Sequence, residues 1–353
     1  MGDPFFSILL PTRNRSEIVD IVLQSYLRQT FTDFEVVVSD NDETEGATRA
    51  AVAKFTDPRI RYFRTNGRFA MHENYENALT HARGRYVLAL EDKLHLVPTA
   101  LEVLHQVCRE HPSSLISYPF NLATGDTLEA SATPGPIRRF SSEEAVEEFC
   151  RFSAVCFDIF PRGLTSCAPR ALMEEARRRS PTGLVFSWVN PDYSQAFQLL
   201  SVADELLYLD HPIIFVPNSV ARTGKYSNGL ASIRKQEQAR RFFESLPIPT
   251  TDMTDDVPVK SHWLYLNPLI YDFRKFYRRP GHNPEIDWVR YHAQCMILVV
   301  TALMWKADMG PEIREIRRSL VERGFVFTVR VLSVFGWRAA RAAWLRVVNR
   351  IRH

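Results

Sequence analysis

The sequence of 353 residues lacks the signatures of several common protein classes. No G-x-G-x-x-G follows the first apolar run and no P-loop motif occurs, which argues against dinucleotide-dependent dehydrogenases and P-loop NTPases. The five cysteines form no C-x-x-C pair, so we expect a reducing compartment and no structural zinc. The longest apolar run, residues 295–305, is about half of a membrane span. We also expect no secretory signal, because the first residues lack a basic region followed by an apolar one.

The composition is that of a globular protein with an unusual end. Hydrophobic residues make up 45% and charged residues 24% of the chain, and its length predicts one large domain plus an addition. The net charge of +3 is unevenly distributed, because seven arginines and no acid follow from Arg323 onward. The end of the chain is therefore electrostatically distinct from the rest.

Short apolar runs alternate with amphipathic segments over the first hundred residues. The runs predict strands at 5–10, 34–38, 59–63 and 86–90. The intervening segments predict helices at 16–27, 48–55 and 73–82. Four strands joined by three helical crossovers indicate an α/β fold with a parallel, doubly wound sheet.

Three of the predicted strands end in polar clusters, at 12–14, 40–42 and 91–93. The carboxyl ends of parallel strands meet at one edge of the sheet, where open α/β folds bind ligands. Any one cluster also fits an ordinary polar loop, but three of them at one edge favour a binding site. The last cluster, Glu91-Asp92-Lys93, is the most informative, because it brings two carboxylates and a cation directly after a buried strand.

These segments together resemble family-2 glycosyltransferases with the GT-A fold. Residues 7–14 resemble the family's first strand and loop, and residues 36–42 its second strand with the acid that binds the nucleoside. Asn74 with residues 82–86 is similar to the segment before the acidic metal motif, on which residues 91–93 fall. The resemblance covers residues 5–100 closely and 101–220 loosely. It implies a Rossmann-like, mostly parallel sheet with helices on both faces, followed here by a C-terminal helical extension.

The resemblance implies transfer of a sugar, with inversion, from a nucleotide diphosphate to a glycan or lipid-linked acceptor in bacterial surface polysaccharide synthesis. A UDP-sugar is the favoured donor. The donor-binding residues that it implies are Pro11, Thr12, Arg13, Asn14, Asp40, Asn74, Glu91, Asp92, Lys93 and Arg222. Asp40 also fits a turn or helix-capping role, Arg13 fits a surface arginine, and the loop around Arg222 fits either a flap over the diphosphate or an ordinary loop.

Lys93 departs from the family pattern, in which this position is usually an acid that binds Mn²⁺ or Mg²⁺. A protonated lysine cannot bind a hard divalent cation. We expect a weak Mn²⁺ or Mg²⁺ site at Asp92, with Lys93 paired to Glu91 or to a phosphate. Two alternatives remain: Lys93 replaces part of the charge of the metal, or it forms a surface pair with Glu91 that has no role in catalysis.

The catalytic base that the resemblance implies is Asp192, at the start of a predicted helix over 193–202. The family's usual Glu-Asp pair is Pro191-Asp192 in this chain. An N-cap role for Asp192 is the structural alternative. Both roles are compatible, because the dipole at a helix start keeps a carboxylate ionised, which is the form that a base requires.

The remainder of the chain changes in character, and we predict a catalytic domain at 1–229, a helix and linker at 230–260, and a helical region at 261–353. Residues 208–216 are expected to form a strand and residues 230–245 a polar helix. Trp337 and other apolar residues recur at helical spacing among the arginines of 325–353, which predicts an amphipathic helix on an anionic membrane. Packing of this helix on the protein or on an oligomer partner is the alternative. Nucleic acid is not expected as a partner, and the expected location is the cytoplasm, at the inner membrane face.

Two other functions remain open at this stage. A GT-A-like nucleotidyltransferase would use the same sheet edge, although it usually has a glycine-rich loop after the first strand, and Pro11-Thr-Arg-Asn-Arg15 contains no glycine. A non-catalytic relative that binds nucleotide sugars or glycans is the second alternative, and Lys93 is the residue that favours it.

Overall fold

The computed structural model describes residues 2–44, 46–122, 125–221 and 228–351. These divide into two compact units. The first unit comprises Met1–Val146, Ala154–Tyr226 and Asp272–His282, and the second comprises Glu147–Ser153, Ser227–Tyr271 and Asn283–His353. The division of the sequence at 229 and 260 stays a prediction.

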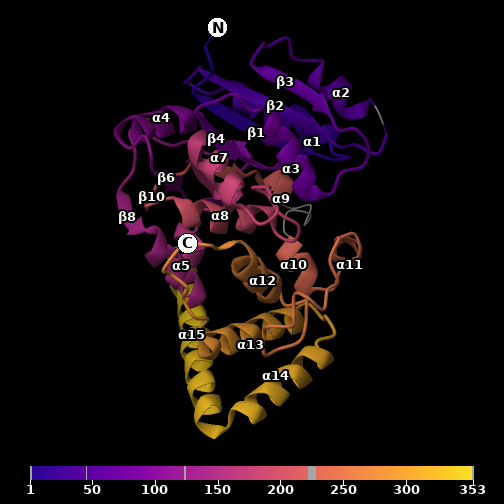
Figure 1. The fold of residues 1–353 in the computed structure, drawn as a ribbon, viewed down its shortest axis with the longest axis vertical. Helices are drawn as coiled ribbons and strands as arrows, with labels where there is room; N and C mark the ends of the chain where they lie inside the picture. Colours follow the sequence, from indigo (N-terminus) through magenta and orange to yellow (C-terminus); the bar gives the residue numbers. More distant parts are fainter. Residues whose placement is uncertain (1, 45, 123–124, 222–227, 352–353) are drawn as a thin grey trace. The chain divides into compact units, whose positions relative to one another are not determined.

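Among the described residues, the large sheet of the first unit has the strand order β3-β2-β1-β4-β9-β6-β10-β8 (Figure 1). Its strands are β1 Phe6–Thr12, β2 Phe34–Asp40, β3 Ile60–Arg64, β4 Tyr86–Ala89, β6 Leu115–Ser117, β8 Ile137–Ser141, β9 Ser166–Pro169 and β10 Glu205–Leu209. The first four strands pair in parallel, whereas β9 is antiparallel to β4 and to β6. The expectation of a mostly parallel sheet is therefore confirmed.

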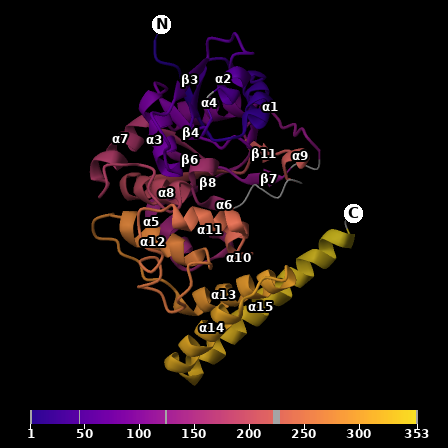
Figure 2. The ribbon, with the colours of Figure 1, turned by 90° about the vertical axis from the view of Figure 1, so that its right-hand side faces the viewer.

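The helices between the first four strands cover both faces of the sheet. They are α1 Ser16–Leu27, α2 Ala47–Val52 and α3 Met71–His81. The chain moves outward from β1 to β3 and then returns past β1 to β4. Because such crossovers are right-handed, this reversal places α1 and α2 on one face and α3 on the other, as Figure 2 shows. The reversal between β1 and β4 is a topological switch point, and ligands bind outside the carboxyl ends of the strands at such points in open α/β sheets.

The second half of the unit adds a small sheet and several helices. The small sheet has the order β5-β11-β7, with β5 His95–Leu96, β7 Phe120–Leu122 and β11 Ile214–Val216. The expectation of one strand over 208–216 is wrong, because β10 and β11 belong to different sheets. Pro212 lies in the break, where its missing N–H cannot continue a ladder. The helices are α4 Ala100–Glu110, α5 Ser142–Cys150, α6 Ala154–Ile159, η1 Gly163–Thr165, α7 Arg170–Arg179, α8 Pro191–Val202 and α9 Asn218–Ala221.

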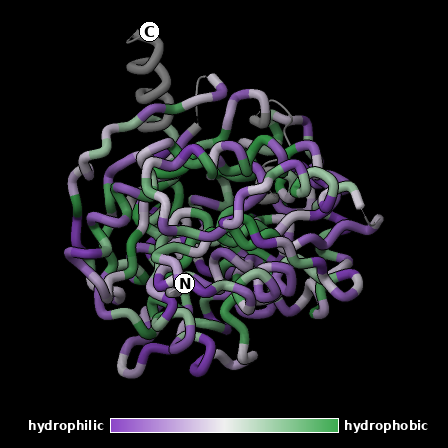
Figure 3. Tube along the Cα trace, turned by 90° about the horizontal axis from the view of Figure 1, so that it is seen from above, coloured by the Kyte–Doolittle hydropathy of each residue, from purple (hydrophilic) through white to green (hydrophobic). Residues whose placement is uncertain are grey.

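The core of the first unit is built from its inner strands. Every residue of β1 and of β2 is buried, so that neither face of these strands contacts solvent. Both read as nearly continuous apolar runs, as expected of a parallel sheet covered on both sides. In Figure 3 many green, hydrophobic stretches of the trace run through the interior, whereas purple, hydrophilic stretches are common at the periphery. This rigid centre fixes the loops that leave it.

The second unit is helical, as expected for the C-terminal region. Its helices are α10 Asn228–Ile233, α11 Glu237–Glu244, α13 Trp288–Met304, α14 Gly310–Arg323 and α15 Phe325–Ile351, and α12 Leu266–Phe276 crosses from the second unit into the first. The expected single helix over 230–245 is wrong, because Lys235, with φ of 51°, separates α10 from α11. Helices α13, α14 and α15 pack together, and His292 bonds Ser319 at 2.8 Å. In the part of the chain that the structure describes, no helix is long and apolar enough to cross a membrane.

Gly84 allows the start of β4 to approach β1 closely, and this contact predicts a stability effect. A Cβ at Gly84 would lie 2.4 Å from the backbone nitrogen of Ser7. Because backbone atoms cannot move aside cheaply, Gly84→Ala should lower the free energy of unfolding by about 1–3 kcal/mol, measured by urea denaturation. Gly336→Ala is the matched control, since nothing lies within 4 Å of its added methyl on α15. A loss in the control as large as that in Gly84→Ala would contradict the packing argument.

Candidate active site

The polar clusters that follow β1, β2 and β4 meet at one edge of the sheet. In the parallel register, Thr12 pairs with Asp40 across β1 and β2. On the other side of β1, Leu9 pairs with Ala89, the last residue of β4. The ends of these three strands therefore converge, as expected from the sequence.

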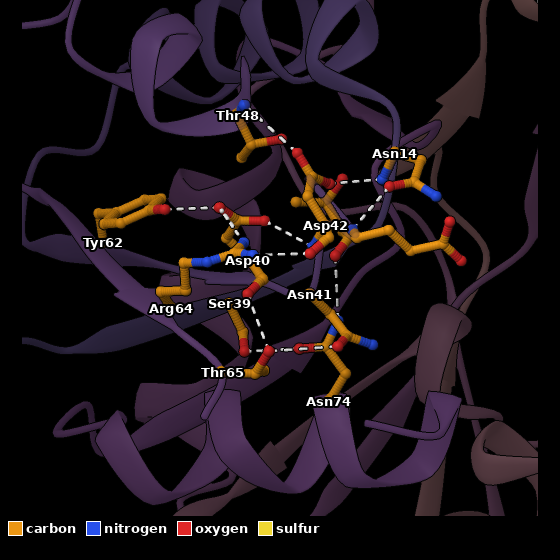
Figure 4. A network of polar contacts seen from close by, with 12 residues as sticks. Asn14, Ser39, Asp40, Asn41, Asp42, Thr48, Tyr62, Arg64, Thr65 and Asn74 are labelled. Carbon is orange, nitrogen blue, oxygen red and sulfur yellow. Dashed lines mark hydrogen bonds and ion pairs between the residues drawn. The ribbon is translucent and has the colours of Figure 1, made fainter. Parts of the chain in front are cut away.

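Asp40 lies at the centre of a buried polar network (Figure 4). Its side chain is fully buried and accepts hydrogen bonds from the Tyr62 hydroxyl at 2.5 Å and from the backbone N–H of Asp42 at 2.8 Å. Arg64 forms an ion pair with the same carboxylate at 3.1 Å. Both carboxylate oxygens thus have partners within the protein, and Asp40 holds the ends of β2 and β3 together.

The loop after β1 is fixed by the residues around this network. Asn14 has a left-handed backbone with φ of 54°, a conformation that asparagine tolerates well. Its N–H donates to the Asp42 carboxylate at 2.5 Å. On the other side, Asn74 of α3 donates to the Thr12 carbonyl at 3.2 Å and accepts from the Ser39 hydroxyl at 2.6 Å. Asn74 therefore ties α3 to the ends of both strands (Figure 4).

Asp92 is held by two side chains from the loop after β1. It is 3% exposed, and its two oxygens accept from the Thr12 hydroxyl at 2.9 Å and from Arg15 at 2.8 Å. Burial raises the pKa of Asp92, against the lowering effect of Arg15. Arg15 was not among the residues predicted from the sequence. Its position directly after the polar cluster Thr12-Arg13-Asn14 is the feature that could have indicated a role in the site.

Glu91 and Lys93 form an ion pair with each other. The Lys93 side chain is 12% exposed and that of Glu91 is 26% exposed, so this pair is not an ordinary surface pair. The edge of β4 therefore carries two neutralised acids, Glu91 with Lys93 and Asp92 with Arg15.

The carboxylates at this edge do not fit a divalent metal as they are arranged. Both oxygens of Asp92 are already bonded, and its nearest acidic neighbour in sequence, Glu91, is paired with Lys93. Over the described residues, no three histidine, cysteine or acidic side chains gather in a group that could hold a metal ion. Hard cations such as Mg²⁺ and Mn²⁺ need oxygen ligands that are free to coordinate.

Asp192 lies at the start of α8, as the sequence predicts for the candidate base. The residue is partly exposed, yet its carboxyl group is densely surrounded, and this burial raises its pKa to about 6. Arg162 acts in the opposite direction, and Glu91 adds to the rise. A carboxylate with a pKa near 6 is ionised at neutral pH and still has enough basicity to accept a proton.

Tyr75 of α3 connects Asp192 with the end of β4. Burial raises the pKa of the Tyr75 hydroxyl well above its ordinary value. The next largest effects come from the charges of Glu91, Asp192 and Asp92. Because such interactions require proximity, all three carboxylates lie near enough to act on this side chain. The sequence-based reasoning identified the acids but missed Tyr75 and Arg162, which no motif marks.

The remaining predicted residues have varied positions. Arg13 pairs with Glu43 at 2.6 Å on the surface, and Pro11 is buried in β1. Arg222 lies outside the described residues.

Residues 7–159 match the family described as Glycosyl transferase family 2. This part of the chain is a family-2 glycosyltransferase domain. Together with the observed sheet, the match confirms the expected GT-A type of α/β fold.

Curated relatives of the family-2 domain are bacterial. The chain is 28% identical over 166 residues to the Campylobacter jejuni GalNAc(5)-diNAcBac-PP-undecaprenol beta-1,3-glucosyltransferase, which covers 46% of this chain and 53% of the relative. It is also 28% identical over 103 residues to Escherichia coli WfgD, a UDP-Glc:alpha-D-GlcNAc-diphosphoundecaprenol beta-1,3-glucosyltransferase, over 29% of this chain and 40% of the relative. The chain thus spans about half the length of the first of these relatives.

A solved structure of S. aureus TarS in complex with UDP-GlcNAc aligns with 85% of this chain and 82% of its own. The sequence identity is 15% and the TM-score 0.48, a similarity too low to bear on the function of this chain.

The paired acids predict how the protein responds to metal. Nucleotide-free protein should show no saturable Mn²⁺ binding in isothermal titration calorimetry, because Asp92 and Glu91 are engaged by Arg15 and Lys93. Lys93→Asp removes one cation and adds a third carboxylate, so we expect this variant to gain saturable binding. Lys93→Met is the matched control, which loses the cation without adding an acid and should stay without binding. Stoichiometric Mn²⁺ binding by the unmodified protein would contradict the assignment.

Proposed function

We propose that the protein is an inverting glycosyltransferase that moves a sugar from a UDP-sugar to a lipid-linked glycan acceptor in bacterial surface polysaccharide synthesis. The observation that carries this proposal is the meeting of the ends of β1, β2 and β4 at one edge of a family-2 domain, where Asp92 is held by Thr12 and Arg15. The names of the relatives support the substrate classes, since both contain undecaprenol-linked acceptors and one contains a UDP-glucose donor.

In this proposal Asp192 is the general base. Its carboxylate takes the proton of the acceptor hydroxyl while that oxygen forms a bond to the anomeric carbon of the donor sugar. The bond from this carbon to the diphosphate oxygen breaks at the same time, and the nucleoside diphosphate leaves with the electron pair. Attack from the face opposite the leaving group inverts the configuration. Positioning the two substrates and a base in this way supplies much of the rate.

The diphosphate would lie near the ends of β1 and β4, where Arg15 and Lys93 provide positive charge. One cation about 4 Å from a phosphate contributes roughly 4 kcal/mol at an effective dielectric constant of about 20. No step of the proposal requires a metal, because the acids at this edge are paired as they stand.

The acceptor class leads us to propose contact with the inner face of the plasma membrane through α14 and α15. Both helices expose large apolar side chains, namely Val321 73%, Phe325 82%, Val326 73%, Val329 44%, Leu332 49% and Trp337 62%. Arg323 and Arg330 are exposed on the same helices. Apolar and basic side chains together favour the surface of an anionic bilayer.

The base assignment predicts a loss of rate without a loss of donor binding. Asp192→Asn keeps the shape of the side chain but cannot accept the proton, so kcat should fall by about 10²–10⁴-fold. Because the base must be ionised, kcat/KM of the unmodified enzyme should rise with pH through about 6, the pKa of Asp192. Transfer of UDP-[¹⁴C]sugar to lipid-linked acceptor measures the rate, and a thermal-shift titration with UDP measures donor binding.

Asp210→Asn serves as the matched control, because it changes an exposed carboxylate at the end of β10. It should leave both the rate and the pH profile unchanged. Unaltered transfer by Asp192→Asn would show that another residue is the base. Absence of any UDP-dependent thermal shift in the unmodified protein would remove the proposed donor class.

The membrane proposal predicts binding to anionic vesicles that depends on exposed apolar side chains. The protein should sediment with vesicles containing phosphatidylglycerol and not with vesicles of phosphatidylcholine alone. Replacing Phe325 and Val326 together by serine should weaken binding at least about tenfold, because each side chain loses an apolar surface that the bilayer would bury. Ile21→Ser, which changes an apolar side chain of α1 that is 53% exposed, is the control and should bind normally. Equal binding to both vesicle types would contradict the proposal.

A further inference from the structure

The start of α8, which carries Asp192, is held in an unusual way. Asn190 is the N-cap residue, and an asparagine there ordinarily accepts a hydrogen bond from the first turn of its helix. In this structure the Asn190 side chain makes no such bond. Instead, its amide donates to Asp272 Oδ2 at 2.8 Å, and its backbone N–H donates to the same oxygen at 3.0 Å.

The Asn190 side chain therefore does not compete for the first amides of α8, and the N–H of Tyr193 donates to the backbone carbonyl of Asn190 at 3.0 Å. The backbone N–H groups of Asp192 and Tyr193 also lower the pKa of the Asp192 carboxyl, against the larger effect of burial. Had the Asn190 side chain capped the helix, it would compete for these donors. The contact with Asp272 therefore determines which group the helix start stabilises.

Asp272 is the first residue of a segment, 272–282, that runs along α8. Phe273 packs against Phe197 with ring centroids 5.5 Å apart. Further along, the N–H of Arg278 donates to the Ser201 hydroxyl at 2.8 Å. Contacts at the start, middle and end of the helix show that the segment fixes α8 along its length.

The segment also contacts residues on both sides of α8, Trp188 in the preceding loop and Ala203 directly after the helix. Lys275 lies over the ring of Trp188 at 5.5 Å, and Arg279 donates to the carbonyl of Ala203 at 2.7 Å. These residues belong to the first unit although the chain on either side of the segment belongs to the second. The chain thus returns to the catalytic unit at Asp272.

The carboxyl group of Asp272 is buried and accepts two hydrogen bonds from Asn190. The residue is 0% exposed, and burial raises its pKa well above the ordinary value. Among the described residues, Oδ1 has no hydrogen-bond partner. The raised pKa disfavours a second negative charge beside Asp192, whose own charge contributes to the rise.

We propose that Asp272 is a positioning residue for the catalytic base, acting through Asn190 on the conformation and ionisation of Asp192. This inference rests on the proposed role of Asp192. The charged and titratable groups that face Asp192 are Arg162, Glu91, Tyr75 and Asp272 itself. A change at Asp272 alters its own carboxyl as well as the contact with Asn190, so Asn190→Ala, which keeps Asp272, separates the two effects.

The test compares two substitutions of Asp272 that differ in hydrogen bonding. Asp272→Asn keeps an oxygen that accepts from Asn190, and kcat should remain within about threefold of the unmodified enzyme. Asp272→Leu keeps the branching of the side chain but removes the acceptor, and kcat should fall at least tenfold with the donor KM unchanged. The acid limb of the pH–rate profile should also move to higher pH in Asp272→Leu, because Asp192 loses hydrogen bonds that lower its pKa.

A role limited to stability would give a different pattern. It would lower the melting temperature while leaving kcat and the pH profile unchanged at temperatures where the variant is folded, and this result would overturn the inference. Asn190→Ala provides a second variant for the case that Asp272→Leu does not fold. It removes one of the two hydrogen bonds that Asn190 donates to Asp272, so kcat should fall in the same direction as in Asp272→Leu with the donor KM unchanged, and an unchanged kcat would overturn the inference.

The outcome also separates this inference from the proposed function. If Asp192→Asn abolishes transfer while Asp272→Leu and Asn190→Ala keep the unmodified profile, only the positioning role is wrong. If Asp192→Asn retains transfer, the base assignment fails and the positioning role fails with it. Loss of transfer in Asp272→Asn as large as in Asp272→Leu would show that the acid itself is needed, which also contradicts the proposal.

Discussion

β1 lies between two parallel neighbours, β2 and β4, and all three strands leave the sheet at the same edge. Because these strands are buried and paired in register, the residues that follow them have little freedom of position. The Thr12 hydroxyl at the end of β1 therefore donates a hydrogen bond to Asp92, which follows β4. The site depends on this register, since a shift of one residue would turn Thr12 away from its present neighbours.

Acids in this site differ in how their charge is balanced. Asp40 and Asp92 each face an arginine, and Glu91 faces Lys93. Asp192 has Arg162 as the cation that lowers its pKa, and burial outweighs that effect. The proposed reaction needs such a difference. The acids that are paired with cations stabilise the structure of the site, whereas Asp192, whose charge is less fully balanced, accepts the proton.

Sequence patterns predicted those parts of the site that depend on local order. Thr12, Asp40 and Asp92 could be predicted because each follows or ends an apolar run. Such a pattern can be recognised from a few neighbouring residues in the sequence. Arg15 was missed because its partner Asp92 is 77 residues away in the chain. Asp272 was missed for the same reason, since it contacts Asn190 across 82 residues and lies in a helix whose apolar and aromatic residues suggested only packing. An acid within an apolar helical segment was the one available signal, and it does not identify its partner.

Lys93 changes what this edge of the sheet requires of a ligand. With an acid at position 93, the end of β4 would carry three adjacent carboxylates against Arg15 alone, and each pair about 4 Å apart would repel by roughly 4 kcal/mol at an effective dielectric constant of about 20. A diphosphate would add to that repulsion, so a divalent cation would be needed to bring the two together. With lysine, Glu91 and Asp92 are each matched by one cation, and the edge is close to neutral before any ligand arrives. The diphosphate then meets two ordered cations in place of an excess of acid, and the electrostatic reason for a metal at this position is largely removed.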